Sequence, residues 1–134
     1  MEKHQDIAIQ SVVAVVDDDA AVRNSLKFSL EIEGFTVRVY SDGAELLEAY
    51  DLSGCACFVV DQNLPGMAGL DVVARLRDRR VSVPAILITS HPTAALSRRA
   101  NCAGVPIVEK PLLGNALIES IHAAVARQSH PGLC

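Results

Sequence analysis

The sequence predicts a single domain of the α/β class, in which helices cover both faces of a parallel sheet. Apolar runs alternate with amphipathic stretches along the chain of 134 residues. Several of these runs are hydrophobic almost throughout, as expected of strands that are buried on both faces. The length allows one core of ordinary size and is too short for two domains. A content of 50% hydrophobic and 21% charged residues excludes general disorder.

Five apolar runs are interpreted as strands: Ser11–Val16, Thr36–Tyr40, Cys55–Val60, Ala85–Ile88 and Val105–Val108. The first, third and fourth runs are nearly continuous in hydrophobicity, which is typical of central parallel strands. The second run alternates apolar and polar residues, so we expect it at an edge of the sheet. Cys55 and Cys57 are two residues apart in one run, which places both on one face of that strand as small buried hydrophobic residues.

Five amphipathic stretches between and after these runs are predicted to be helices: Ala20–Glu33, Asp42–Tyr50, Ala68–Arg80, Thr93–Ala103 and Leu112–Gln128. Gly34 and Gly104 follow two of them as C-terminal stops. Asp42 opens the second helix and Glu45 follows three residues later, as in a capping box. Strands that alternate with helices, joined by right-handed crossovers, indicate an α/β sandwich with a parallel sheet.

Composition and charge exclude several classes of function. The formal net charge is −4 with no run of basic residues, so we do not expect this domain to bind nucleic acid. One stretch is crowded with arginines, which we interpret as a solvated helix end where cations suit the helix dipole: Arg75, Arg77, Arg79 and Arg80. No apolar run approaches the ~20 residues needed to cross a bilayer. The polar start MEKHQDIAIQ is not a secretory signal, so a cytoplasmic protein is expected.

Polar side chains directly follow four of the five apolar runs, in chain order: Asp17, Asp18 and Asp19; Asp61; Thr89 and Ser90; Glu109 and Lys110. Ligands of an open parallel sheet bind beyond the carboxyl ends of its strands, so we expect these side chains to converge. Carboxylates this close repel one another unless a cation intervenes, and Mg²⁺ suits a carboxylate site that also binds phosphate. Together with a lysine and a hydroxyl, they predict a site that stabilises a phosphoryl group in transfer.

Each of these signals also has an ordinary structural explanation. A role as a helix N-cap explains Asp19 about as well as a role in the site does. Thr89 could bond to backbone at a strand end, and Asp61 could form a turn. Their joint order on successive strand ends favours the functional interpretation.

Four segments together resemble the receiver domain of bacterial two-component response regulators: VVDDDAAVRNSL, VVDQNLPGMAGLDV, ILITS and VEKP. They resemble in particular the branch whose receivers precede a LuxR-type output domain. The resemblance spans about Val12 to Val125. It implies a flavodoxin-like fold with strand order 2-1-3-4-5, and a receiver domain over residues 11–128. Residues 1–10 would then be a flexible segment and residues 129–134 a tail.

The resemblance implies a role for each acidic residue. Asp61 would be the nucleophile that accepts a phosphoryl group from a phosphohistidine. Asp18 would bind Mg²⁺ directly, Asp17 would help through water, Asp61 would be a further metal ligand, and Asn63 would offer its backbone carbonyl. The partner would be a sensor histidine kinase or a histidine phosphotransfer protein. The domain would not be an enzyme beyond catalysing its own phosphoryl transfer and slow autodephosphorylation.

The remaining site residues would contact the phosphoryl group or modulate it. Thr89 and Lys110 would each contact a phosphoryl oxygen, and the Lys110–Pro111 bond is expected to be cis. Asn63 and His91 would flank the attacking water and set the lifetime of the phosphorylated state. The loop of Ser90 and His91 would follow Thr89 toward the phosphoryl group.

The resemblance also implies a signalling surface, at about Thr93–Gln128, for a homodimer or an output partner. One residue of this surface departs from the receiver pattern. Receivers commonly carry Tyr or Phe three residues before the lysine, but this chain has Ile107, so the usual coupling to Thr89 is in doubt. Met1 and the irregular end favour a stand-alone receiver over a piece of a larger regulator.

Two other functions remain as alternatives. A haloacid-dehalogenase-like phosphatase also uses a strand-end Asp with Mg²⁺, but it needs a second Asp where this chain has Asn63. A pseudo-receiver would bind partners without phosphorylation. The complete set of acidic, hydroxyl and lysine residues argues against it, whereas Ile107 favours it.

Overall fold

The computed structural model describes residues 11–112 and 114–128, and these form a five-stranded sheet with the order β2-β1-β3-β4-β5. The strands are β1 (Val12–Val16), β2 (Thr36–Tyr40), β3 (Cys57–Asp61), β4 (Ala85–Thr89) and β5 (Ile107–Glu109). All four pairings are parallel, which confirms the predicted class, the strand order and the edge position of β2. The predicted segments 1–10 and 129–134 lie outside the described residues.

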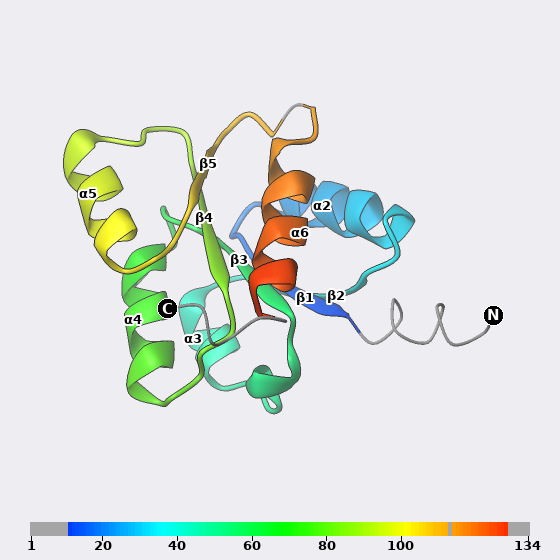
Figure 1. The fold of residues 1–134 in the computed structure, drawn as a ribbon, viewed down its shortest axis with the longest axis horizontal. Coiled ribbons are helices and arrows are strands. Elements are labelled where there is room, and N and C mark those ends of the chain that lie inside the picture. Colours follow the sequence, from blue (N-terminus) through cyan, green and yellow to red (C-terminus); the bar gives the residue numbers. More distant parts are fainter. Residues whose placement is uncertain (1–10, 113, 129–134) are drawn as a thin grey trace.

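Helices cover both faces of this sheet. They are α2 (Ala20–Ile32), α3 (Gly43–Leu47), α4 (Gly69–Asp78), α5 (Ala94–Cys102) and α6 (Ala116–Gln128), with a short 3₁₀ turn η1 (Leu52–Gly54). In Figure 1, α3, α4 and α5 lie on one side of the sheet, and α2 and α6 lie on the other. The domain is therefore a three-layer sandwich, as the alternating pattern predicted.

The core has two halves, one on each face of the sheet. The half beneath α3, α4 and α5 includes Leu46, Leu76 and Leu87, all fully buried. The half beneath α2 and α6 includes Leu30 and Ile121, also fully buried. Successive side chains of β1 point into opposite halves, because side chains alternate along a strand. This is why the central strands are apolar at nearly every position.

Three strands end one residue later than the sequence predicted. Asp61 is the last residue of β3 and Thr89 is the last of β4, although both are polar. Each still has a partner in the ladder, since Asp61 lies opposite Ile88 and Thr89 lies opposite Glu109. Register with the neighbouring strand, rather than hydrophobicity, decides where these strands end.

The prediction that Cys55 and Cys57 share one face of a strand was wrong. Cys55 precedes β3, where its N–H donates to the Leu52 carbonyl in the turn after η1. Its side chain packs in the core half beneath α4, whereas Cys57 packs in the half beneath α6. Both thiols are buried, as predicted, and burial raises the pKa of Cys57 to about 12.

All five helices are shorter than predicted, α3 and α6 by the largest margin, four residues each. Gly114, at φ 71°, keeps the chain in a turn before α6 begins at Ala116. The helix α3 is only five residues long and ends at Leu47. Its start follows the capping pattern, since Asp42 accepts the Glu45 N–H at 2.8 Å, but the Glu45 carboxylate accepts from Ser41 rather than from the cap residue.

The arginine-rich end of α4 is solvated only in part. Arg75 and Arg80 are exposed, as predicted. Arg77 is half-buried, and its guanidinium donates to the carbonyls of Val81 and Val83 at 2.8 and 2.9 Å. The prediction was therefore wrong for Arg77, which anchors the turn after α4.

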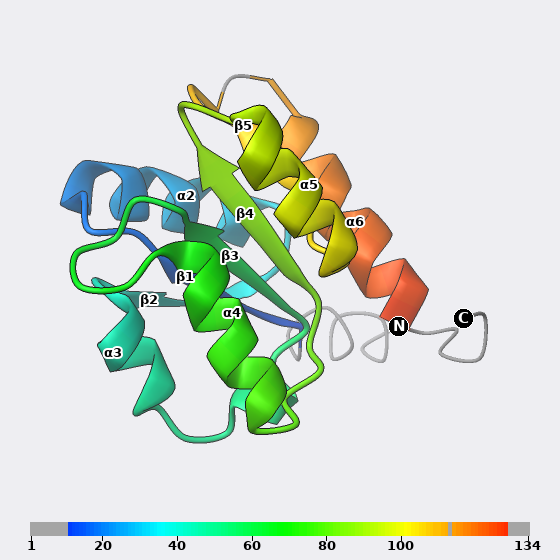
Figure 2. The same cartoon turned by 90° about the vertical axis from the view of Figure 1, so that its left-hand side faces the viewer.

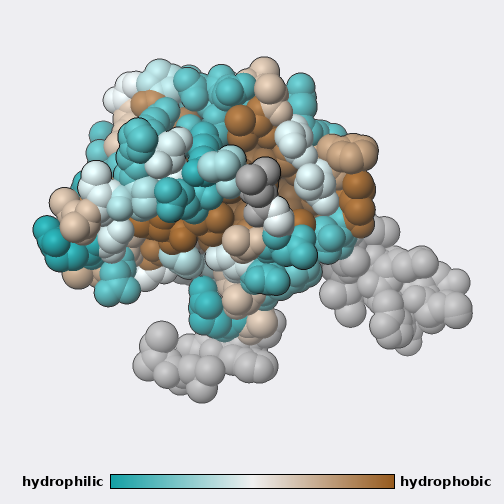
Figure 3. All heavy atoms as spheres, turned by 90° about the horizontal axis from the view of Figure 1, so that it is seen from above, coloured by the Kyte–Doolittle hydropathy of each residue, from teal (hydrophilic) through white to brown (hydrophobic). Residues whose placement is uncertain are grey.

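The surface is mixed in polarity. Figure 2 shows α4 and α5 side by side on one face of the sheet, and Figure 3 shows mostly hydrophilic residues from above, with hydrophobic residues between them. Among the described residues, no helix is both long enough and apolar enough to span a membrane.

Within α2, burial predicts which substitutions destabilise the fold. Leu30 is fully buried and Ile32 is 67% exposed, two residues apart on the same helix. Leu30→Ala should lower the free energy of unfolding by about 2–5 kcal/mol, because it leaves a cavity. Ile32→Ala should change it by no more than about 0.5 kcal/mol. Urea unfolding measures both, and equal losses in the two variants would contradict this packing.

Candidate functional site

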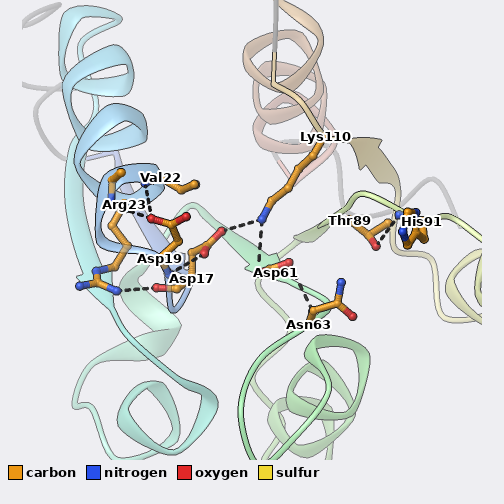
Figure 4. A network of polar contacts seen from close by, with 10 residues as sticks. Asp17, Asp19, Val22, Arg23, Asp61, Asn63, Thr89, His91 and Lys110 are labelled. Atoms are coloured by element: carbon orange, nitrogen blue, oxygen red, sulfur yellow. Dashed lines mark hydrogen bonds and ion pairs between the residues drawn. The ribbon is translucent and has the colours of Figure 1, made fainter.

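Four strand ends bring the predicted site residues to one edge of the sheet. Asp17 directly follows β1, Asp61 ends β3, Thr89 ends β4 and Lys110 directly follows β5. Figure 4 shows the Lys110 side chain reaching between the two carboxylates. Its Nζ lies 3.2 Å from Asp17 Oδ2 and 3.4 Å from Asp61 Oδ2. The convergence predicted from the sequence is therefore present.

Asp17 is the most deeply buried acid of the group, with no exposed surface. Its Oδ1 accepts the Asp19 N–H at 2.9 Å. Its Oδ2 is buried and, among the described residues, has no hydrogen-bond partner of good geometry, although Lys110 is close enough for an ion pair. A buried carboxylate oxygen left in this state is costly, so the site favours a further cation.

The charge balance around Asp61 is unfavourable for its ionised form. Burial raises the pKa of this carboxyl, and the Asp17 carboxylate raises it further. The Asn63 N–H, which donates to Asp61 Oδ1 at 3.3 Å, and the Lys110 ammonium act in the opposite direction without offsetting the rise. Burial lowers the pKa of Lys110, but the two carboxylates outweigh burial and raise it. The Lys110 ammonium therefore forms ion pairs with two carboxylates.

Asp18 completes an acidic group at the mouth of the site. Asp17, Asp18 and Asp61 each offer a carboxylate oxygen, and these oxygens lie within 4.8 Å of one another. Asp18 is exposed, whereas the other two acids are buried. A hard divalent cation with oxygen ligands fits this donor set, and the unpartnered Asp17 Oδ2 is an independent reason for one to bind.

Asp19 stands apart from this group. It is the N-cap of α2, and its Oδ1 accepts the N–H groups of Ala21 and Val22 at 2.9 and 3.4 Å. The alternative left open by the sequence, a helix cap, is therefore its role.

The hydroxyl side of the site is formed by the end of β4. Thr89 is buried, and its Oγ1 accepts the His91 N–H at 3.2 Å. This leaves the hydroxyl hydrogen available to donate. Ser90 and His91 are exposed, and His91 Nδ1 lies 2.9 Å from the Ser90 carbonyl oxygen. Figure 4 shows Thr89 and His91 on one side of Asp61, with Asn63 below it.

Comparison with known proteins decides the family. A family model described as the response regulator receiver domain matches residues 13–122. The chain belongs to this family. The transcriptional regulatory protein FixJ of Bradyrhizobium diazoefficiens is 33% identical over 120 residues, which cover 89% of this chain and 58% of FixJ. The response regulator protein TodT of Pseudomonas putida is 32% identical over 116 residues, 86% of this chain and 51% of TodT.

Solved structures show the same fold. The CheY-like receiver domain protein of Methanospirillum hungatei JF-1 superposes with a TM-score of 0.81 at 26% identity, covering 91% of this chain and 98% of that one. The chain is a receiver domain of a two-component response regulator, as the sequence resemblance implied. It spans little more than half the length of its curated relatives, 58% for the FixJ protein named above.

Two expectations attached to the receiver resemblance concern β5. The Lys110–Pro111 peptide bond is cis, as expected. Ile107 is half-buried and packs against the core half beneath α4, opposite Leu87 of β4. The usual aromatic position of receivers is therefore part of the apolar packing here.

Sequence reasoning missed three residues that hold the receiver site in shape. Arg23 donates from its Nη1 to the Asp17 carbonyl at 2.7 Å. Gln62 caps α4, since its Oε1 accepts the Leu70 N–H at 2.9 Å where the cap residue Ala68 offers no side-chain bond. Gly69 lies directly against the Asp61 backbone. No local pattern signals these roles, because each depends on a contact between separate segments.

Gly69 provides a test of this close approach. A Cβ at position 69 would overlap the Asp61 carbonyl, whereas a Cβ at Gly54 would meet nothing within 4 Å. Gly69→Ala should therefore cost about 1–3 kcal/mol of stability, because backbone must move. Gly54→Ala should cost no more than about 0.5 kcal/mol. Thermal and urea unfolding measure both; a Gly69→Ala protein as stable as Gly54→Ala would show that the approach is not tight.

Proposed function

We propose that this receiver domain, residues 11–128, is a phosphoacceptor whose nucleophile is Asp61. The observation that carries the proposal is the placement of Asp61 at the end of β3, buried, with its Oδ2 3.4 Å from Lys110 and a second acid alongside. The phosphoryl donor would be the phosphohistidine of a sensor kinase or of a phosphotransfer protein. A signalling role then follows from the family, and no separate substrate is involved.

The chemistry proposed is a phosphoryl transfer between two side chains. An Asp61 carboxylate oxygen attacks phosphorus, the phosphorus–nitrogen bond to the donor imidazole breaks, and an acyl phosphate forms. Lys110 neutralises a phosphoryl oxygen, and the Thr89 hydroxyl donates to another. Water later attacks phosphorus, which returns Asp61 as a carboxylate and releases inorganic phosphate.

Magnesium fits this site. Asp17 and Asp18 would hold it through their carboxylates, directly or through water, and Asn63 would hold it through its backbone carbonyl. Bound there, the ion supplies positive charge for the phosphoryl oxygens in transfer. The three clustered acids and the unpartnered Asp17 oxygen support this assignment.

A phosphorylated Asp61 would change the contacts of the domain. The phosphoryl group adds roughly two negative charges next to Thr89. Thr89 is joined to α5 by the short loop of Ser90 and His91, so a shift of its side chain reaches the surface of α5, β5 and α6. This surface would contact an output partner or a second receiver. Ile107 packs within it, so the shift would not use an aromatic ring.

Two observations bear on the alternatives. A phosphatase of the haloacid-dehalogenase type needs an acidic group two residues after the nucleophile. The Asn63 side chain at that position is an amide, which is not an acid, and its backbone N–H donates to Asp61. A pseudo-receiver would not need the full constellation. Asp17, Asp61, Thr89 and Lys110 nevertheless converge at one edge of the sheet, which favours the phosphoacceptor.

The phosphoacceptor function predicts a covalent adduct. Incubation with Mg²⁺ and a small acyl-phosphate donor should add one phosphoryl mass to the wild type and none to Asp61→Asn. Intact-mass spectrometry reads the result, with EDTA in place of Mg²⁺ as a second control. If the wild type gains no adduct even from a purified kinase, the pseudo-receiver alternative replaces this one.

Asn63 and His91 should set the lifetime of the adduct. Both are exposed and flank Asp61 and Thr89, where the attacking water would approach. Asn63→Ala and His91→Ala should each change the dephosphorylation rate constant by at least about threefold, or about 0.7 kcal/mol in the barrier. Stability should stay within about 0.5 kcal/mol of the wild type. Ser53→Ala, at an exposed position within η1, is the control, and dephosphorylation rates unchanged in both site variants would contradict the assignment.

A further inference from the structure

A groove runs between α4 and α5, away from the phosphoacceptor site. It has a volume of about 630 Å³. The α4 wall is a regular stripe of residues three and four apart, Leu70, Val73, Ala74 and Arg77. The α5 wall is formed by Arg98, Arg99, Cys102 and Ala103. The α4 stripe covers about 10 Å along the helix axis, which is two helical turns.

The floor and walls of this groove suit another helix. Leu70 and Val73 form an apolar floor at the edge of the core. Ala74, Cys102 and Ala103 are small, so a third helix could approach the pair closely. The groove is open along its length, whereas a small-molecule site would enclose its ligand. Figure 2 shows the two helices that bound it, side by side on one face of the sheet.

The rim of the groove is positive. Arg98 is exposed and, in the part of the chain that the structure describes, enters no ion pair. Arg99 pairs with Asp71 of α4 at 3.3 Å, but both side chains are more than half exposed, so this pair adds little stability. Arg77 closes one end, with its guanidinium held by the turn after α4.

The positive rim belongs to a wider asymmetry of charge. Six of the 12 basic residues of the chain lie between positions 69 and 103, with only two of the 16 acidic residues. The domain as a whole has a net charge of −4. An acidic partner would therefore be attracted to this face and repelled by the rest of the molecule.

We propose that the groove between α4 and α5 binds an acidic amphipathic helix of a partner protein. Leucine-like side chains of that helix would cover Leu70, Val73 and Ala74. Carboxylates on its flanks would pair with Arg98 and Arg99, the latter exchanging Asp71 for the partner. This is a helix-in-groove interaction, with anchors at i, i+3, i+4 and i+7. It does not require phosphorylation of Asp61.

A second copy of this chain is the less suitable occupant. The exposed apolar residues of α2, Phe28 and Ile32, lie beside the Lys27–Glu31 ion pair. The charges of this pair cancel, so this face offers less negative charge to the arginine rim than an acidic helix would.

The test uses the intact chain and a fluorescein-labelled helical peptide of about 14 residues, with leucine at the four anchor positions and glutamate on both flanks. Fluorescence anisotropy should show binding that weakens as salt rises. Arg98→Glu should weaken it at least about tenfold, because it reverses a rim charge. Arg75→Glu is the matched control, since Arg75 is an exposed residue of α4 outside the groove, and binding should stay within about threefold.

A second measurement locates the peptide. Cys102 lies in the groove wall and is exposed, whereas Cys55 and Cys57 are buried. Saturating peptide should slow alkylation of Cys102 by iodoacetamide, followed by peptide-level mass spectrometry. The proposal is overturned if the glutamate peptide does not bind, if a lysine-flanked peptide binds equally well, or if both arginine variants lose affinity equally. It is also overturned in favour of a second copy if the chain self-associates and Arg98→Glu abolishes that association.

Discussion

Two buried carboxylates face one lysine at the end of the parallel sheet, and the arrangement of the site follows from this imbalance. Asp17 and Asp61 each have a carboxylate oxygen within 3.4 Å of Lys110 Nζ, so one positive charge faces two negative charges. Burial and mutual repulsion raise the pKa of Asp61, which shows that Lys110 does not offset them fully. A group of acids held together at this cost is expected where function requires it. A cation beside Asp17 would offset the excess negative charge, which a phosphoryl group on Asp61 would increase further.

The fold holds these groups in place through contacts that tolerate little change. Ladder pairing of Asp61 with Ile88 and of Thr89 with Glu109 fixes where the Asp61 carboxylate and the Thr89 hydroxyl lie along the sheet. Outside the ladder, Arg23, Gln62 and Gly69 tie the site loops to α2 and α4. Rigid elements thus position the two buried acids, the lysine and the hydroxyl, whereas Asn63 and His91 lie in exposed loops.

The sequence predicted the features that depend on local pattern. Alternating apolar runs and amphipathic stretches determined the class, and the polar residues that follow each run determined the site. It could not predict features that depend on contacts between distant segments. The cap that Gln62 provides to α4 and the groove between α4 and α5 depend on how helices pack against the sheet. Cys55 was assigned to the wrong face for a local reason, because a turn after η1 displaces it from the strand.

The negative charge at Asp61 determines the electrostatic balance of the site, and the unfolding free energy of the metal-free protein reports its cost. A raised folded-state pKa means that stability is lost as pH rises from the ordinary aspartate value, about 3.9, through the folded value. Asp61→Asn removes this loss. In EDTA at pH 7 the variant should be more stable than the wild type, and the difference should fade below about pH 3.9. Mg²⁺ should stabilise the wild type more than the variant. Equal stability of the two proteins in EDTA at pH 7, or equal stabilisation of both by Mg²⁺, would contradict the account.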